Sequence, residues 1–244
     1  GFKRAGGEIL LVCHQDLLAQ TLKRLSMFVL RAKVKLSDAS DQFALYGLLG
    51  DATKPIAEQP AITGAKADFE QGTLINLHPA GTTARQLWLC STDSPAPAGP
   101  PATLDAWLWG EVRSGVATLS AAVVEAFVPQ MLNYESVGGV NFKKGCYPGQ
   151  EVVARSQFRG TLKRRTYLAH SPVALKVGDP VFSPTDPEQP AGTVVQAAVA
   201  PQGGFDALVS LQVAAVEGGT LHLEGVQGPA LTLLELPYAL LEDI

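Results

Sequence analysis

Hydrophobic and polar positions change their spacing several times within the first 36 residues. A short apolar run at 8–13 is typical of a buried strand. Residues 16–28 place apolar side chains three or four positions apart, with basic side chains opposite, which predicts an amphipathic helix. From 28 to 36 apolar and basic residues alternate, with Leu30 and Val34 on one face, which predicts a further strand. This strand–helix–strand order indicates an α+β fold rather than an all-β fold.

The middle of the chain continues with apolar runs that are separated by turn residues. The sequence predicts strands at 42–49, 72–78 and 85–91, a turn at 78–81, a proline-rich loop at 94–101, a helix at 103–113 and a short helix or loop at 120–132. The helix at 103–113 carries aromatic bulk at Trp107 and Trp109.

From about residue 166 onward, short apolar runs alternate with turns that are rich in glycine and proline. The runs lie at 167–169, 180–183, 193–199, 205–213, 220–223 and 231–236. This alternation of apolar runs and turns predicts a small antiparallel barrel or sandwich, with a domain boundary near residue 164.

The composition narrows the class of protein. Hydrophobic residues make up 46% of the 244 residues and charged residues 17%, the proportions of a folded globular protein. The three cysteines are odd in number and widely spaced, which argues against a disulfide framework and a zinc ribbon and favours the reducing cytoplasm. No apolar stretch approaches the ~18 residues of a membrane span, so we expect no membrane partner.

The net charge of −4 conceals a strong segregation of charge. Residues 143–165 carry seven basic side chains and one acidic side chain, and residues 1–35 carry seven and two. Such segments can attract an anionic ligand, or they can be solvated faces that nearby acids balance in the fold. The sequence leaves both interpretations open.

The segment 138–165 carries the most specific chemistry. Tyr147-Pro148-Gly149-Gln150 has the residues of a type II turn, and Gln150 and Glu151 can bind backbone groups that lock it. Gly145 precedes Cys146, permits an unusual backbone angle and leaves the thiol room. Nearby cations at Lys143, Lys144 and Arg155 would favour the thiolate. The alternative is that Cys146 is a small buried hydrophobic residue.

The run Lys144-Gly145-Cys146-Tyr147-Pro148-Gly149-Gln150-Glu151 resembles the signature of the YgfZ family, Lys-Gly-Cys-[Phe/Tyr]-x-Gly-Gln-Glu, at every position. The flanking stretches 127–133, 138–143 and 151–155 are similar as well. The ending Leu236-Pro237-Tyr238 is also a family feature.

The resemblance implies the fold of the glycine-cleavage T-protein. Residues 1–135 would be the folate-binding region, residues 136–165 the signature and basic connector, and residues 166–244 the C-terminal β-barrel. Family members begin with a further N-terminal portion. The resemblance therefore implies that the folate-binding region is incomplete at the N-terminus of this sequence.

The resemblance also implies tetrahydrofolate as the ligand and Cys146 as the functional thiol. The family links folate binding to an indole before a Glu-x-x-x-Gly segment, and the matching position is Trp107, eight residues before Gly115. An indole face is a good partner for a flat pterin, whereas the alternative is a tryptophan of the core. Arg113 or Lys143 would meet the glutamate carboxylates of folate.

In function, the resemblance implies an accessory factor that supports iron–sulfur enzymes or their assembly proteins, including enzymes that modify tRNA. It leaves open whether the chain catalyses any reaction. One alternative is a folate-dependent, aminomethyltransferase-like one-carbon transferase, although that enzyme lacks the cysteine-centred signature. Another is an RNA-binding module that makes weak contacts through 143–165, with aromatic side chains at Tyr147, Phe158 and Tyr167.

Other common sites are not indicated by the sequence. There is no dinucleotide-binding glycine motif, Walker loop or zinc-protease motif. The four histidines are scattered and neighbour no carboxylate–histidine cluster, so we expect each to be a loop or surface residue rather than a ligand. Three distant cysteines cannot supply the four thiolates that usually hold an iron–sulfur cluster. We therefore expect no metal site within the chain.

Overall fold

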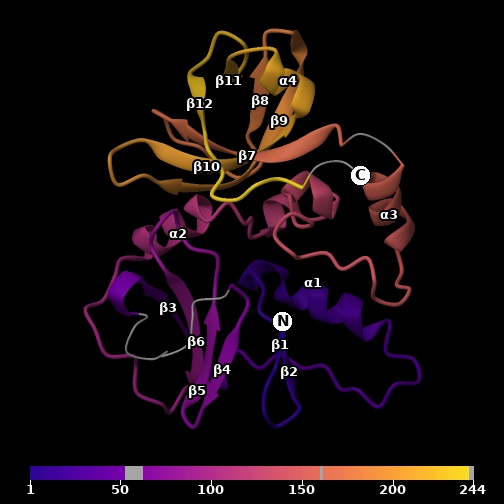
Figure 1. Cartoon of the computed structure of the whole chain (residues 1–244), viewed down its shortest axis with the longest axis vertical. Coiled ribbons are helices and arrows are strands. Elements are labelled where there is room, and N and C mark those ends of the chain that lie inside the picture. Colours follow the sequence, from indigo (N-terminus) through magenta and orange to yellow (C-terminus); the bar gives the residue numbers. More distant parts are fainter. Residues whose placement is uncertain (53–62, 160–161, 242–244) are drawn as a thin grey trace. The chain divides into compact units, whose positions relative to one another are not determined.

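The computed structural model describes residues 1–52, 63–159 and 162–241, and the chain divides into two compact units, Gly1–Ala102 and Thr103–Ile244 (Figure 1). The helices of the described residues are α1 (Gln15–Ser26), α2 (Leu104–Arg113), α3 (Gln150–Phe158) and α4 (Val213–Glu217). Among them, none combines the length and the apolar character that crossing a membrane requires. Helices and antiparallel sheets occur together, so the α+β prediction is confirmed.

The first unit contains a four-stranded antiparallel sheet in the order β3-β6-β5-β4. Its strands are β3 (Phe43–Leu49), β4 (Lys66–Phe69), β5 (Gly72–Asn76) and β6 (Arg85–Ser91). Leu48, Leu74, Trp88 and Cys90 form a small core on this sheet. The strands predicted at 42–49, 72–78 and 85–91 are therefore confirmed.

The beginning of the first unit departs from the sequence pattern at one point. Helix α1 confirms the helix predicted at 16–28, but the run at 8–13 pairs only through β2 (Ile9–Leu10), opposite β1 (Phe2–Lys3). The strand predicted at 28–36 was wrong. A period-two pattern yields a strand only where a neighbour completes its backbone hydrogen bonds. Within the described residues no strand pairs with 28–36, and Leu30 is 86% exposed.

The second unit contains a closed antiparallel barrel of six strands in the order β10-β7-β12-β11-β8-β9. The strands are β7 (Arg164–Ser171), β8 (Pro180–Ser183), β9 (Asp186–Val199), β10 (Phe205–Gln212), β11 (Leu221–Leu223) and β12 (Ala230–Leu234). Of the two predicted architectures, the structure therefore has the barrel.

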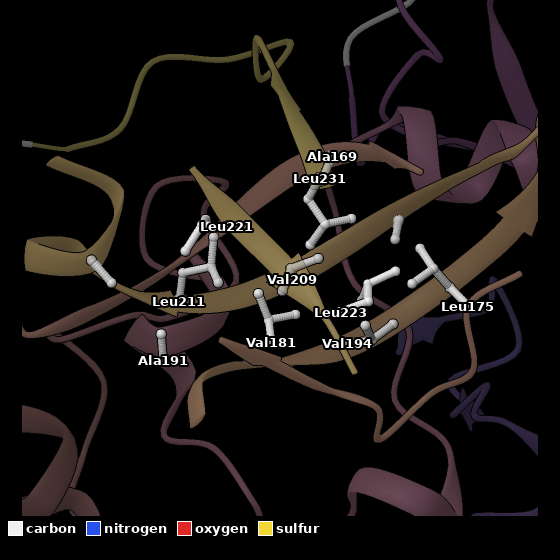
Figure 2. Close-up of a cluster of buried hydrophobic side chains, with 12 residues drawn as sticks. Ala169, Leu175, Val181, Ala191, Val194, Val209, Leu211, Leu221, Leu223 and Leu231 are labelled. Carbon is white, nitrogen blue, oxygen red and sulfur yellow. The ribbon is translucent and has the colours of Figure 1, made fainter. Parts of the chain in front are cut away.

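The barrel strands bury side chains on both of their faces. Residues that point inward, such as Ala169 and Val209, form the core shown in Figure 2. Their neighbours Leu168 and Leu208 point outward and pack with Val112 of α2 in a second core. Successive side chains of a strand point to opposite faces, so adjacent residues contribute to different cores. Each fully buried Leu or Val side chain contributes roughly 1.5–3 kcal/mol to stability.

The connection between α2 and the barrel contains two short 3₁₀ helices, η2 (Ala121–Val123) and η3 (Pro129–Leu132), which confirms the prediction of a short helix or loop at 120–132. The barrel begins with β7 at Arg164. The three domain ranges taken from the family resemblance remain a prediction. The loop before α3 and α3 itself carry the signature, and like α2 and η3 they belong to the second unit.

Candidate functional site

Helix α2 carries the indole that the resemblance links to folate. The helix starts at Thr103, whose hydroxyl oxygen accepts a hydrogen bond from the backbone N–H of Ala106 at 3.2 Å. Such a cap satisfies a donor that the first turn would otherwise leave unpaired. Trp107 is half-buried, and it is Trp109 that packs against the outer core of the barrel. The indole of Trp107 therefore keeps exposed surface for a ligand.

Asp206 of β10 holds the C-terminal half of α2. Its side chain is buried, and its Oδ2 accepts a hydrogen bond from Nε1 of Trp109 at 2.8 Å. The guanidinium of Arg113 lies 3.6 Å from the same oxygen and 5.8 Å from the centre of the Trp109 ring. Arg113 thus compensates the charge of a buried carboxylate. A folate carboxylate would have to compete with Asp206 for it.

His170 lies on β7 rather than in a loop, and its Nδ1 lies 2.8 Å from Oδ1 of Asp206. The two residues are 36 positions apart in the sequence, and the antiparallel pairing of β7 with β10 places them directly opposite each other. His14 also contacts a carboxylate, that of Asp16, at 2.7 Å.

The Glu-x-x-x-Gly segment after Trp107 meets the Leu-Pro-Tyr ending of the family pattern. Gly115 has a φ of +72°, and a Cβ at this position would lie 2.7 Å from the ring of Tyr238. The Tyr238 hydroxyl donates a hydrogen bond to the carbonyl oxygen of Gly115 at 2.7 Å. A side chain would be both strained and obstructed here, so this contact requires glycine.

The signature forms the turn that its residues predict. Gly149 has φ 85° and ψ −2°, the values of the third residue of a type II turn. The N–H of Gln150 donates to the carbonyl oxygen of Tyr147 at 3.2 Å, and Oε1 of Gln150 accepts from the N–H of Tyr147 at 3.3 Å. The predicted type II turn and the locking role of Gln150 are confirmed. Helix α3 starts directly after the turn.

Cys146 lies in the exposed loop just before this turn. Cys146 and Cys13 are exposed, whereas Cys90 is buried, so the alternative of a buried Cys146 was wrong. Open space surrounds Gly145, as expected, and its φ is not positive, so this glycine provides room and does not adopt the left-handed conformation. The ammonium of Lys144 lies 4.4 Å from the centre of the Tyr147 ring. Stabilisation of a Cys146 thiolate by these cations remains a prediction.

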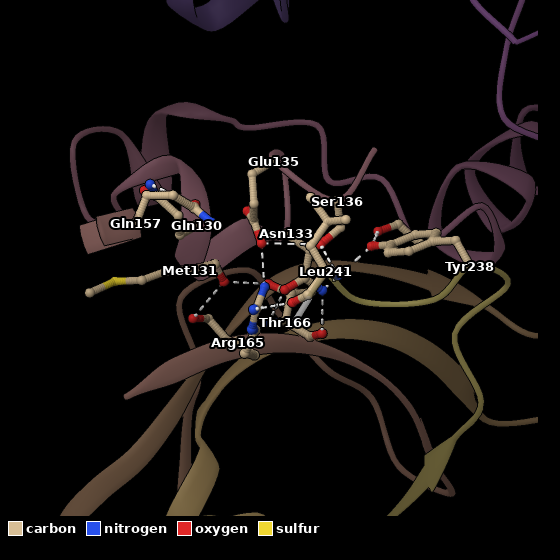
Figure 3. A network of polar contacts seen from close by, with 12 residues as sticks. Gln130, Met131, Asn133, Glu135, Ser136, Gln157, Arg165, Thr166, Tyr238 and Leu241 are labelled. Carbon is tan, nitrogen blue, oxygen red and sulfur yellow. Dashed lines mark hydrogen bonds and ion pairs between the residues drawn. The ribbon is translucent and has the colours of Figure 1, made fainter. Parts of the chain in front are cut away.

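Gln130 of η3 holds α3, the helix that follows the signature turn, in place. The Gln130 side chain is fully buried, and its Nε2 donates to the carbonyl oxygen of Val153 at 2.7 Å. The same nitrogen lies 3.5 Å from Oε1 of the buried Gln157 (Figure 3). A buried amide that loses its hydrogen bonds destabilises the fold, so these bonds fix the position of α3 on η3.

Asn133 and Glu135 join the same region to the barrel. Asn133 adopts a left-handed conformation, and its amide pairs with both backbone groups of Thr166, at 2.7 and 3.3 Å. Glu135 forms a buried ion pair with Arg165, whose Nη2 also donates to the carbonyl oxygen of Leu241 at 2.9 Å. These contacts tie three distant stretches of chain together. The loop and helix of the signature therefore extend from a fixed base.

Sequence reasoning missed Gln130, Asn133, Glu135 and Asp206 as positioning residues. Asn133 offered one usable signal, because asparagine tolerates the left-handed conformation that ends many helices. The basic segment 143–165 also proves heterogeneous, since Arg165 is buried against Glu135 whereas Lys143 and Arg155 are exposed. Charge counts along the sequence do not distinguish these two environments.

The described residues contain no cluster of three or more histidine, cysteine or acidic side chains that could hold a metal ion. No family model matches the chain.

Proposed function

We propose that this chain is a tetrahydrofolate-binding accessory factor with a T-protein-like fold. In this proposal it supports the assembly or maintenance of iron–sulfur enzymes, including tRNA-modifying ones, in the cytoplasm. The observation that carries the proposal is the signature Lys144–Glu151, which presents Cys146 on an exposed loop beside a hydrogen-bonded type II turn.

This arrangement suits a thiol that acts on another protein. A partner can reach an exposed cysteine only if the surrounding chain leaves it open, and Cys146 meets this condition. The turn hydrogen bonds of Gln150 and the buried contacts of Gln130 limit the loss of conformational freedom on docking. The loop would therefore present the thiol in a reproducible position.

The second unit supplies further support for the T-protein-like fold. Its barrel follows the signature in the chain, as the resemblance implies. Gly115 and Tyr238, from two separate stretches of the family pattern, are in direct contact. This contact is one structural explanation for the presence of both residues.

The residues proposed for folate fit it to different degrees. Trp107 offers a half-buried indole on which a pterin can stack. Lys143 is exposed and can pair with a glutamate carboxylate, which requires an accessible cation. Arg113 is paired with Asp206, so it fits this role less well than Lys143 does.

Titration calorimetry with a reduced folate tests the proposed ligand. Removal of the indole in Trp107→Ala should weaken binding about five- to tenfold, because stacking and contact area are lost. Leu104→Ala, at an exposed position of the same helix, is the matched control and should bind like the wild type. Unchanged affinity in Trp107→Ala would assign Trp107 to a structural role. No binding by the wild type would remove folate from the proposal.

A further inference from the structure

The loop before α3 and α3 itself carry two exposed aromatic side chains in mutual contact. Phe142 is 39% exposed and Phe158 52% exposed, although folding usually buries phenylalanine. Their ring centres lie 5.2 Å apart at an angle of 68°. The edge-to-face contact holds both rings in place at the surface, where each retains accessible area.

Four cations accompany this pair within the exposed part of the basic segment. Lys143, Lys144, Arg155 and Arg159 are exposed, and none has a carboxylate partner in the part of the chain that the structure describes. Between 141 and 159 the only acidic residue is Glu151. The chain as a whole has a net charge of −4, so this surface is positive on a negative protein. Its charge is complementary to a polyanion.

Two of the three remaining cations of the basic segment serve the fold, whereas the third, Lys163, is exposed next to the first barrel strand. Arg165 is buried against Glu135, and Arg164 donates to the carbonyl oxygen of Ala191 at 3.4 Å. Tyr167, the third aromatic residue considered from the sequence, packs against the interior of the barrel. Most of the exposed cations of the segment therefore lie on α3 and in the loop before it.

We propose that Phe142, Phe158 and these four cations form a binding surface for single-stranded nucleic acid. Such surfaces combine cations that meet phosphates with aromatic rings on which bases stack. An acidic protein partner would explain the charge, but lysine is depleted in the centres of protein–protein interfaces, and two of the four cations are lysines. The inference does not depend on the proposed folate site.

Binding can be measured by fluorescence anisotropy with a labelled oligouridylate of about 12 nucleotides, which lies within the usual site sizes. We expect weak, salt-dependent binding by the wild-type protein. Phe142→Ala/Phe158→Ala should weaken it about tenfold through lost stacking. Arg155→Gln/Arg159→Gln should reduce the slope of log K against log salt by about 1.4, since each phosphate contact contributes ~0.7.

Matched controls lie on the barrel side of the same unit. Lys176→Gln and Val199→Ala change an exposed cation and an exposed apolar side chain, and both variants should bind like the wild type. Thermal melting of every variant establishes that the fold is retained. All of the substituted side chains are exposed, so their melting temperatures should remain close to that of the wild type.

An abasic strand of the same length separates stacking from charge. It should bind the wild-type protein about as weakly as the oligouridylate binds the double phenylalanine variant. Equal affinity of the wild type for the abasic strand and the oligouridylate would overturn the proposal. So would displacement of the oligouridylate by polyglutamate at equal charge concentration, since that result would assign the surface to acidic proteins. Absence of binding at low salt would also overturn it.

Discussion

Two parts of the second unit use the same residue types in opposite ways. Where η3 meets β7, charged and amide side chains are buried, and each has a defined partner, as in the pair Glu135–Arg165. In the loop before α3 and along the outer side of that helix, Lys144, Cys146 and Arg155 face solvent. The first region fixes the geometry of the second. Positions that look equally polar in the sequence therefore divide into a buried group that holds the fold and an exposed group that is open to partners.

The largest effect is expected for the buried ion pair. Glu135→Ala removes the buried carboxylate that pairs with Arg165, which should lower the free energy of unfolding by about 3–5 kcal/mol. Urea denaturation measures this change. Glu188→Ala removes the same side chain from an exposed position of the barrel and should change stability by less than about 0.5 kcal/mol. Similar losses in the two variants would contradict the distinction between the regions.

Gly115→Ala should have the next largest effect. The new Cβ would meet the ring of Tyr238 in a left-handed backbone conformation, so we expect a loss of about 2–4 kcal/mol. Gly178→Ala is a control for backbone strain alone, because its φ is +95° and its Cβ position is open. That variant should lose only about 1–2 kcal/mol. Equal losses would show that the contact with Tyr238 contributes nothing.

Alkaline pH should weaken the buried region and spare the exposed one. Burial, with a smaller contribution from Tyr238, raises the pKa of Tyr134 from 10.0 to about 12. The folded state thus favours the neutral form of Tyr134. This preference contributes to the free energy of unfolding below pH 10, and the contribution is lost as pH rises toward 12. The loss should be on the order of 2 kcal/mol.

Denaturation of the wild type and Tyr134→Phe across this pH range tests the assignment. The variant should be less stable near neutral pH, since it loses the hydrogen bond from the Tyr134 hydroxyl to the carbonyl oxygen of Ala117. Its stability should fall less steeply above pH 10, because the titration of Tyr134 no longer contributes. Parallel slopes in the two proteins would assign the alkaline loss to other groups.

The smallest effect on stability is expected at the signature thiol. Cys146→Ala removes an exposed side chain, so the free energy of unfolding should change by less than about 0.5 kcal/mol. Cys90→Ala removes a buried side chain from the core of the first unit and should lower the free energy of unfolding of that unit by more. A strong destabilisation by Cys146→Ala would mean that the thiol has a structural role.

Local patterns predicted the local elements of the structure well. The type II turn at Tyr147–Gln150, the helix that carries Trp107 and the strands of the barrel all follow from the order of nearby residues. Each depends on turn chemistry or on periodicity within about ten positions. The segment 28–36 shows the limit of this approach, because a strand also needs a partner that periodicity does not supply.

Long-range contacts account for what the sequence did not reveal about the site. Asp206 meets Trp109 across 97 positions, and Tyr238 meets Gly115 across 123. The partners of buried polar groups are set by strand pairing and by packing, which a single sequence does not encode in its local spacing. For this reason the turn beside Cys146 could be predicted from nearby residues, whereas the residues that position its loop could not.

The most direct test of the central claim is complementation of a bacterium that lacks its YgfZ-family protein. The readout is the activity of an iron–sulfur enzyme that modifies tRNA, with equal amounts of each variant in the cell. The wild type and Cys13→Ala, which alters the other exposed cysteine, should restore this activity, and Cys146→Ala should fail to do so. Full restoration by Cys146→Ala would contradict the proposed role of the signature thiol.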